Sequence, residues 1–328
     1  MQLQAAIGQA LEQGRWQGPI ARATAAAFGP LVARAVVRRL TLPAGARVIA
    51  VGGATLGGSG KTPLAVACAR ELAAMGARVA LVGHAYRARP GVARRVFPDD
   101  PAAQVGDEAL VAARELGPAV PVVVAPKRAG AIEHAARLAQ ILVLDGVLQT
   151  APERVALALL AVDDDEPWGH AGAVPPRGDL QAPVDALRAA ADEVVTIGGP
   201  ASDARVTSCG AWVGDRLVAW EEMRGRRLGL MCALGRPERV LRFLARRGIV
   251  PVAVVRGADH GPIPGDLLLR ARRDVDVWLT TTKCALHAPA LPDLPLCFAT
   301  IDYALVLSAH VRRSLAHAAR LDPAVVQQ

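Results

Sequence analysis

Short apolar runs alternate with longer amphipathic segments between residues 47 and 146. Apolar strands that alternate with helices are typical of a parallel sheet covered by helices on both faces. Ligands of such sheets bind at the carboxyl ends of the strands. We expect strands at RVIAVGG (47–53), RVALVG (78–83), PVVVAP (121–126) and ILVLDG (141–146), separated by helices over 60–75, 107–116 and 128–139.

A second α/β pattern follows EVVTIGG (193–199), a further expected strand. Residues 206–220 look like a short hairpin. Beyond them we expect strands in 227–234, 249–255, 275–281 and 294–301, a helix over 236–248 and a closing helix over about 305–321. We therefore predict a first domain of residues 1–200, a linker hairpin over 201–220, and a smaller α/β domain over 221–328 that closes an active-site cleft.

The first fifty residues mix arginines with apolar residues. Their segment ATAAAFGPLVARAVVRRL (23–40) is helical in composition, and we expect Pro30 to break it. Two interpretations are open. The segment is either a pair of helices packed on the first domain, or an interfacial segment that places Phe28, Leu31 and Val32 among lipid head groups while its arginines meet anionic lipid.

Composition narrows the class of protein. Five scattered cysteines without a C-x-x-C pair indicate a reducing compartment rather than a disulfide framework or a zinc site. We expect neither a signal peptide nor a membrane span. The net charge of +8 comes from arginine, with lysine only at 61, 127 and 283, and the 3% of aromatic residues argue against nucleic-acid binding.

The segment GGATLGGSGKTP (52–63) joins a predicted strand to a predicted helix and is rich in glycine. Backbone N–H groups of such a loop can point at one phosphate chain, and the helix N-terminus favours the negative charge. Thr55 stands where the usual phosphate-binding loop has its first glycine, and we expect the later glycines to supply the flexibility. The predicted nucleotide-binding residues are Thr55, Gly57, Gly58, Ser59, Gly60, Lys61 and Thr62.

Asp145 ends a predicted buried strand, as the magnesium-holding acid of phosphate-binding-loop proteins does. With Lys61 reaching the β- and γ-phosphates, we expect Thr62 and Asp145 to hold Mg²⁺ and the chain to bind ATP. The acidic run at residues 163–166 could attract a metal, but we favour a solvated turn.

The loop resembles that of the tetraacyldisaccharide 4′-kinases of lipid A biosynthesis, which read G-N-L-T-V-G-G-T-G-K-T-P and also carry a threonine at the position of Thr55. The likeness continues through VGDEALVAAREL, PKR, ALGRPERV and ADHG, and so spans roughly residues 20–320 in order. The family's fold is a phosphate-binding-loop α/β fold.

The resemblance implies ATP-dependent phosphoryl transfer to the 4′-hydroxyl of a lipid-anchored disaccharide, at the cytoplasmic face of the bacterial inner membrane. It makes Asp107 the candidate base and pairs it with His260, with Lys61 as a third catalytic residue. Arg128, Gln149 and Tyr86 are weaker substrate candidates. Anionic membrane is an expected partner, and no obligate protein partner is evident. Asp107 could instead cap its helix, and His260 could be an ordinary loop residue.

The chain also departs from the family. Gly146 and Thr150 replace a second acid and a histidine, His84 replaces an arginine, and TTKC stands for T-E-K-D. Gln181 and Ala182 replace an arginine and a glutamate. A non-catalytic nucleotide-binding or membrane-adaptor relative is therefore the alternative, and a ligase or a GTPase is a third reading, the GTPase weakened by the absence of a guanine-binding signature.

Overall fold

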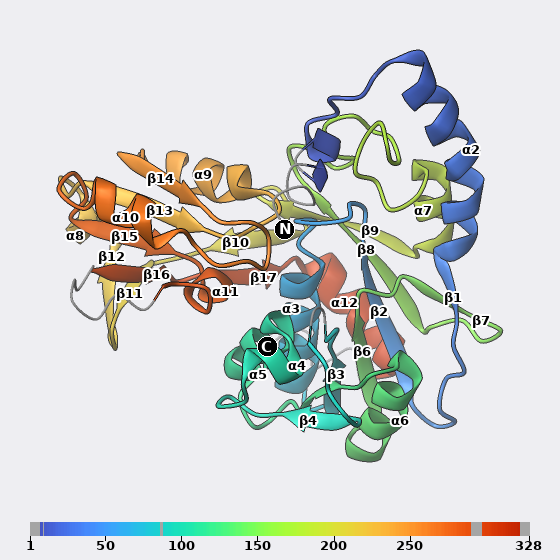
Figure 1. Ribbon diagram of the computed structural model, residues 1–328. Coiled ribbons are helices and arrows are strands. Elements are labelled where there is room, and N and C mark those ends of the chain that lie inside the picture. The colour runs from blue at the N-terminus through green and yellow to red at the C-terminus, as the bar shows by residue number, and fades with distance from the viewer. Residues whose placement is uncertain (1–6, 9, 86–87, 290–296, 322–328) are drawn as a thin grey trace. The chain divides into compact units, whose positions relative to one another are not determined.

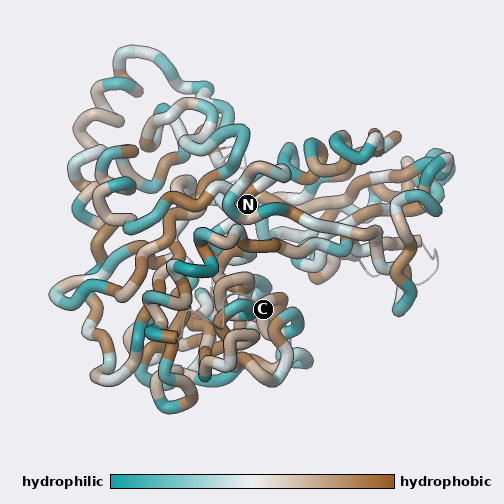
Figure 2. Tube along the Cα trace, turned by 180° about the vertical axis from the view of Figure 1, so that it is seen from behind, coloured by the Kyte–Doolittle hydropathy of each residue, from teal (hydrophilic) through white to brown (hydrophobic). Residues whose placement is uncertain are grey.

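The computed structural model describes residues 7–8, 10–85, 88–289 and 297–321, and the chain divides into two compact units. The large unit comprises Ala10–Val206 and Leu305–Gln328, and the small unit comprises Met1–Gln9 and Thr207–Ala304. Each unit has its own sheet and its own apolar core (Figures 1 and 2).

A nine-stranded sheet forms the centre of the large unit, with the strand order β17-β10-β9-β8-β2-β6-β3-β5-β4. The pairs from β10 to β5 are parallel, and β4 is antiparallel to β5. The predicted mostly parallel sheet is therefore confirmed. The bounds are β2 (Arg47–Gly53), β3 (Val79–Val82), β4 (Arg94–Val96), β5 (Val122–Val124), β6 (Ile141–Asp145), β8 (Leu157–Asp163), β9 (Glu193–Gly198), β10 (Ala204–Thr207) and β17 (Ala304–Leu307).

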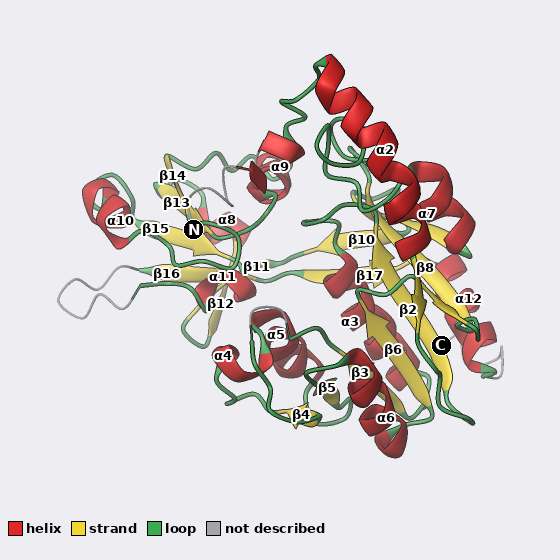
Figure 3. Cartoon of the chain, turned by 45° about the vertical axis from the view of Figure 1, so that its right-hand side comes forward, coloured by secondary structure: helices red, strands yellow, loops and turns green. Residues whose placement is uncertain are grey.

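Helices cover both faces of this sheet (Figure 3). On one face α3 (Lys61–Ala74) packs on β2, β3 and β6, with α5 (Asp107–Leu116) and α12 (Ala309–Ala319) beside it. The core of the other face joins α2 (Pro19–Ala35), α6 (Arg128–Leu138) and α7 (Val184–Ala190) through Ala25, Ile132 and Leu187. The short α4 (Ala102–Val105) precedes α5, and β1 (Val37–Arg39) pairs with β7 (Gln149–Ala151) in a separate two-stranded sheet.

The prediction lacked β8, although this strand lies next to β2 in the middle of the sheet. All seven of its residues are buried. A strand buried on both faces shows a continuous apolar run rather than alternation, and such a run resembles a buried helix in sequence. The strand positions the acidic run at 163–166 beside the carboxyl end of β2.

The small unit contains a six-stranded sheet in the order β12-β11-β16-β15-β13-β14. Its parallel part runs from β16 to β14, and the hairpin β11–β12 adds two antiparallel strands. The bounds are β11 (Gly210–Val213), β12 (Arg216–Ala219), α8 (Trp220–Met223), β13 (Leu228–Cys232), α9 (Pro237–Ala245), β14 (Ala253–Arg256), α10 (Gly265–Ala271), β15 (Val277–Thr280), α11 (Thr282–Ala285) and β16 (Phe298–Ile301).

The two units differ from the predicted domains at both ends of the small unit. The hairpin predicted as a linker is part of the small unit's sheet, because β11 pairs with β16. The closing helix α12 packs on α3 and β2, so the chain returns to the large unit after Ala304. Sequence patterns do not reveal such a return, because the helix has the same amphipathic form in either place.

The expected break at Pro30 is wrong, because α2 runs through it as one helix. Only Ala25 and Gly29 of this helix are buried, and small residues there allow a close approach to the rest of the unit. Ile20 and Leu31 are 83% and 60% exposed, whereas Val32 packs against the core. The predicted lipid contact of Val32 is therefore not available in this conformation.

Replacing Pro30 by alanine should stabilise the large unit. Proline lacks the N–H that would bond to the carbonyl of Ala26, and in a helix interior it is about 3 kcal/mol less favourable than alanine. Pro19 provides the control, because it lies at the first turn of the same helix, where proline is tolerated. We expect Pro30→Ala to raise the thermal midpoint and Pro19→Ala to leave it unchanged or lower it. A lower midpoint for Pro30→Ala would show that the packing of α2 requires the proline.

Candidate active site

The loop between β2 and α3 has the conformation that phosphate binding requires. Its positive φ angles fall on Gly58 (+64°) and Gly60 (+83°), positions that other residues adopt only at a cost. Thr55 has no such angle, and its hydroxyl donates to the carbonyl of Gly57 at 2.7 Å. A threonine is therefore accommodated at the place of the usual first glycine, because the left-handed turns occur later in the loop.

A second segment holds the start of the loop in place. The N–H of Leu56 donates to the carbonyl of Asp179 at 2.8 Å, and the N–H of Gln181 donates to that of Ala54 at 2.9 Å. The side-chain amide of Gln181 also donates to the carbonyl of Thr55 at 2.9 Å. Gln181, which replaces a family arginine, thus positions the loop backbone instead of offering a charge.

The predicted metal ligands Thr62 and Asp145 lie in contact. The Thr62 hydroxyl donates to Asp145 Oδ2 at 2.7 Å. The contact follows from the sheet, because β6 pairs with β2 in a register that places Asp145 opposite Val51, close to the loop. The other carboxylate oxygen, Oδ1, is buried and has no hydrogen-bond partner. The same is true of the Ser59 hydroxyl. Buried polar atoms without partners are rare in proteins and here indicate a place prepared for a ligand.

Burial raises the pKa of Asp145 above its ordinary value, and nearby Glu108 acts in the same direction. Lys61, the Thr62 hydroxyl and Arg128 oppose this shift. A carboxylate and a hydroxyl are hard oxygen ligands of the kind that Mg²⁺ binds in nucleotide sites. The residues present therefore fit a magnesium ion.

Arg128, the first residue of α6, contacts the carboxyl end of strand β3. Its Nη1 donates to the carbonyls of Val82 and Gly83 at 3.3 and 3.1 Å. A Cβ at Gly146 would lie 3.6 Å from Arg128 Nη2 and 3.9 Å from Lys61 Cε. A second acid at this position would thus face two cations, and the glycine, with φ of +78°, leaves their charge less balanced.

His84 follows β3 and is part-buried beside the same cations. Burial and then Arg128 lower its pKa, with smaller effects in the same direction from Lys61 and Arg38 and an opposing one from Glu108. The ring is therefore uncharged at neutral pH, where the family's arginine would be charged. Arg38 and Glu108 belong to this environment but were missed as site residues. Glu108 directly follows Asp107 in the family-like motif VGDEALVAAREL, and this position could have identified it as a site residue.

Asp107 is buried at the first position of α5. One of its carboxylate oxygens accepts from the N–H of Glu108 at 2.8 Å, and Gly106, with φ of +90°, occupies the capping position. The carboxylate thus assists the first turn of the helix without being its N-cap residue. A Cβ at Gly106 would lie 3.2 Å from the His84 carbonyl, so the start of α5 adjoins the end of β3.

His260 belongs to the small unit, on the loop after β14, and its backbone adopts a positive φ of 53°. Its pairing with Asp107 stays a prediction. Tyr86 lies outside the described residues.

Comparison with known proteins identifies the family. The family model described as tetraacyldisaccharide-1-P 4′-kinase matches residues 24–320. The tetraacyldisaccharide 4′-kinase of Nitrobacter hamburgensis is 33% identical over 273 residues, which cover 79% of this chain and 80% of the relative. That of Methylobacterium radiotolerans is 36% identical, covering 79% and 81% of the two chains.

This chain belongs to the tetraacyldisaccharide-1-P 4′-kinase family. The predicted family and the assignment as a kinase are confirmed. The fold of LpxK from Aquifex aeolicus, solved as an "apo" form in complex with ATP, matches with a TM-score of 0.63 at 18% identity, covering 90% of this chain and 99% of that one. The phosphate-binding-loop α/β fold is therefore confirmed as well.

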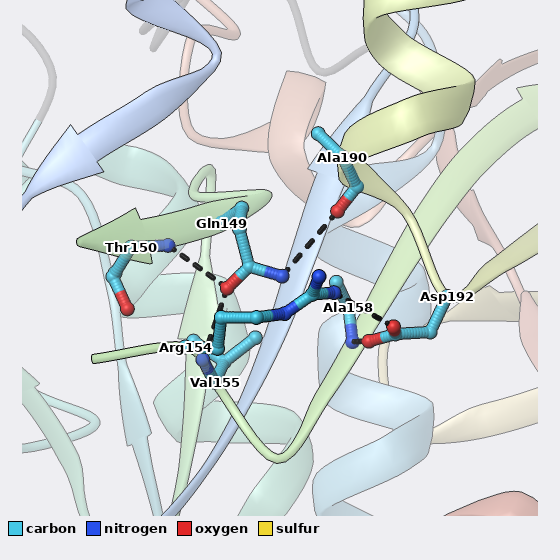
Figure 4. A network of polar contacts seen from close by, with 7 residues as sticks. All are labelled: Gln149, Thr150, Arg154, Val155, Ala158, Ala190 and Asp192. Carbon is cyan, nitrogen blue, oxygen red and sulfur yellow. Dashed lines mark hydrogen bonds and ion pairs between the residues drawn. The ribbon is translucent and has the colours of Figure 1, made fainter. Parts of the chain in front are cut away.

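Gln149, a predicted substrate residue, joins three segments of the large unit by hydrogen bonds (Figure 4). The side chain is buried, and its Oε1 accepts from the N–H groups of Thr150 and Val155 at 3.0 Å each. Its Nε2 donates to the carbonyl of Ala190 at 3.4 Å. Both ends of the amide are thus used within the large unit, and the contact of Gln149 with substrate stays a prediction.

The acidic run at 163–166 begins with a buried carboxylate, whereas Asp165 is exposed and Asp164 and Glu166 are half-buried. Asp163 is 4% exposed, and its Oδ1 accepts from the N–H groups of Asp165 and Glu166. Asp164 accepts from the N–H of Gly199 and from the Ser202 hydroxyl, tying β8 to the end of β9. These carboxylates could surround a cation by their spacing, but their hydrogen bonds already account for their position.

Within the part of the chain that the structure describes, no helix combines the length and the apolar character that crossing a bilayer requires.

Asp145→Asn should stabilise the metal-free protein at neutral pH. The folded pKa lies above the unfolded one, so stability from this group is fully present below the ordinary pKa of 3.8 and is lost as pH rises through the raised value. Denaturation is measured in EDTA. The free energy of unfolding should be higher for Asp145→Asn than for wild type at pH 8, and this difference should become smaller toward pH 4.

The exposed Asp99→Asn serves as the control and should change stability little at either pH. If Asp145→Asn is the less stable protein at pH 8, attraction from Lys61 and Arg128 outweighs burial, and the pKa of Asp145 is not raised.

Proposed function

We propose that this protein transfers the γ-phosphoryl group of ATP to the 4′-hydroxyl of a tetraacylated disaccharide precursor of lipid A. The observation that carries the proposal is the contact of Thr62 with the buried Asp145 carboxylate beside a phosphate-binding loop, in a chain that matches the kinase family over residues 24–320. The names of the relatives support the acceptor, and the ATP complex of the Aquifex aeolicus protein supports the donor.

The loop and the helix N-terminus bind and orient the phosphates in this proposal. The backbone N–H groups around Gly58 and Gly60 supply donors, and Lys61 at the start of α3 supplies a compact positive charge. Thr62 and Asp145 would hold Mg²⁺, which when bound neutralises charge on the β- and γ-phosphates. Positioning and electrostatic stabilisation account for most of the catalysis of phosphoryl transfer.

Asp107 is the proposed base for the sugar hydroxyl. Its carboxylate is buried at the start of α5, and its neighbour Glu108 is close enough to Asp145 and His84 to affect their pKa values. This supports a base near Asp145, because removal of a proton requires a group within reach of the bound acceptor. His260 is proposed as a second catalytic residue.

The direct test is transfer of labelled phosphate from ATP to a tetraacyldisaccharide 1-phosphate acceptor, separated by thin-layer chromatography. The proposal predicts a labelled lipid that forms only with Mg²⁺ and the acceptor. Gly146 favours a second candidate, a nucleotide-binding relative without turnover, because the two cations near it lack the family's second acid. ATP binding without a labelled lipid would support that candidate.

Lys61→Ala should weaken ATP binding, because it removes a charge-assisted contact worth about 1.5–3 kcal/mol. Calorimetric titration of ATP measures the loss, expected at about 10- to 150-fold in Kd. Lys127→Ala is the control, since Lys127 is exposed ahead of α6. Equal affinities of wild type and Lys61→Ala for ATP would show that the nucleotide does not bind at this loop.

Asp107→Asn should lower kcat by about 10²–10⁴-fold, the range for a positioned general base. Asparagine keeps the size and can still accept the N–H of Glu108, so the thermal midpoint and the Kd for ATP should hardly change. The reverse outcome, a lower midpoint with the specific activity of the folded fraction intact, would assign Asp107 to helix stability and place the base elsewhere.

We also propose that the protein meets the cytoplasmic face of the inner membrane through α2. Ile20, Leu31 and the 39% exposed Phe28 form its apolar contacts, and Arg22 and Arg34 supply positive charge. The double variant Ile20→Ser, Leu31→Ser should co-sediment less with anionic vesicles. The control Val92→Ser, at an exposed apolar residue outside α2, should match wild type. Binding should also fall with salt, because each arginine near an anionic surface contributes about 1 kcal/mol. Unchanged sedimentation of the double variant would exclude this face of α2.

A further inference from the structure

Lys283 and His260 lie in direct contact at the carboxyl edge of the small unit's sheet. Lys283 Nζ is 3.1 Å from His260 Nε2 and 3.6 Å from Asp259 Oδ1. The carboxylate of Asp259 is also 3.7 Å from His260 Nε2. The imidazole is 9% exposed and the lysine side chain 18% exposed, so their contact is largely shielded from water, whereas the Asp259 side chain is 40% exposed.

The elements that carry the two side chains are fixed to each other through β13. Lys283 lies in α11, which directly follows β15 (Figure 3), and His260 lies on the loop after β14. β13 separates these strands in the sheet. The N–H of Ala233, just after β13, donates to Cys284 Sγ at 3.2 Å, and Thr281 caps α11 by accepting from the N–H of Cys284. The lysine is therefore held by its neighbours on both sides.

The backbone at His260 is also constrained. Its φ of 53° lies in the left-handed region, where residues other than glycine are uncommon and cost free energy. The N–H of Gly261 donates to the carbonyl of Ala258 at 2.8 Å, which closes a tight turn. A Cβ at Gly257 would lie 2.7 Å from the carbonyl oxygen of Pro262, so the turn has little room to relax. The turn thus orients the ring toward Lys283.

Hydrogen-bond chemistry then decides the form of the ring. An ammonium group has three donors and no acceptor, and Lys283 Nζ lies beside the Asp259 carboxylate. A hydrogen bond between Lys283 and His260 therefore requires the lone pair to be on Nε2. The ring proton must then be on Nδ1, because a neutral imidazole carries one proton.

We propose that Lys283 is a positioning residue that, with Asp259, holds His260 as the neutral imidazole protonated at Nδ1. Because Lys283 occupies Nε2, His260 takes part in the reaction as a hydrogen-bond donor through Nδ1 and does not accept the proton of the sugar hydroxyl. This role rests on the proposed function. The lysine is one of only three in the chain, and arginine supplies the other cations.

Nuclear magnetic resonance tests the tautomer without reference to activity. Long-range ¹H–¹⁵N spectra of the full chain labelled at histidine distinguish Nδ1–H from Nε2–H rings, and a His260→Gln sample assigns the signal among the seven histidines. We expect Nδ1–H in wild type and in Lys283→Arg, because guanidinium also only donates. Lys283→Met should shift His260 to Nε2–H or a mixture. The exposed Lys127→Met is the matched control and should leave the spectrum unchanged.

Kinetics of the same proteins provides the second measurement. Lys283→Met should lower kcat by at least about tenfold, toward the range of a lost acid–base group, with KM for ATP unchanged. Lys283→Arg should retain most of the rate. An Nε2–H ring in wild type, or an unchanged tautomer and rate in Lys283→Met, would overturn the proposal. If Lys283→Met does not fold, the wild-type spectrum still decides. A wild-type protein without transferase activity would instead refute the proposed function. The spectra would still decide which ring nitrogen of His260 carries the proton.

Discussion

The hydrogen bond from the Thr62 hydroxyl to the buried carboxylate of Asp145 connects the start of α3 to the end of β6. It requires the parallel register of β2 and β6 and the left-handed turns at Gly58 and Gly60. Burying a carboxylate is costly unless other groups compensate for it, and Asp145 keeps one oxygen without a partner. The cost is understandable if a cation completes the site, because a buried carboxylate beside a metal ion is stabilised by it.

The departures from the family change the charges around this pair while leaving the loop intact. Gln181 holds the backbone of the loop, and His84 is uncharged at neutral pH where an arginine would be charged. At Gly146 the second acid is missing next to Arg128 and Lys61. Relative to the family pattern, cations are lost at His84 and Gln181 and anions at Gly146 and Ala182. These changes oppose each other in net charge, which is consistent with a site that still binds polyphosphate.

Most of what could be predicted from the sequence depends on local patterns. The loop, Asp145 at the end of its strand and the start of α5 follow from residues that are close in the chain, and their placement agrees with the predicted elements. The hydrogen bond from Gln149 to Ala190 could not be predicted, because the two residues are 41 positions apart in the chain. The strand β8 was missed since a continuously apolar run does not distinguish strand from helix. The return of α12 to the large unit depends on tertiary packing alone.

The claim that the Thr62–Asp145 pair is a magnesium site is tested most directly by thermal stabilisation with nucleotide. The midpoints of wild type, Thr62→Val and Asp145→Asn are compared in ATP with Mg²⁺ and in ATP with EDTA. A ligand that binds the folded state raises the midpoint in proportion to the logarithm of its concentration over Kd. We predict that Mg²⁺ adds to the stabilisation of wild type and that both variants lose this addition. An equal effect of Mg²⁺ on all three proteins would contradict the account.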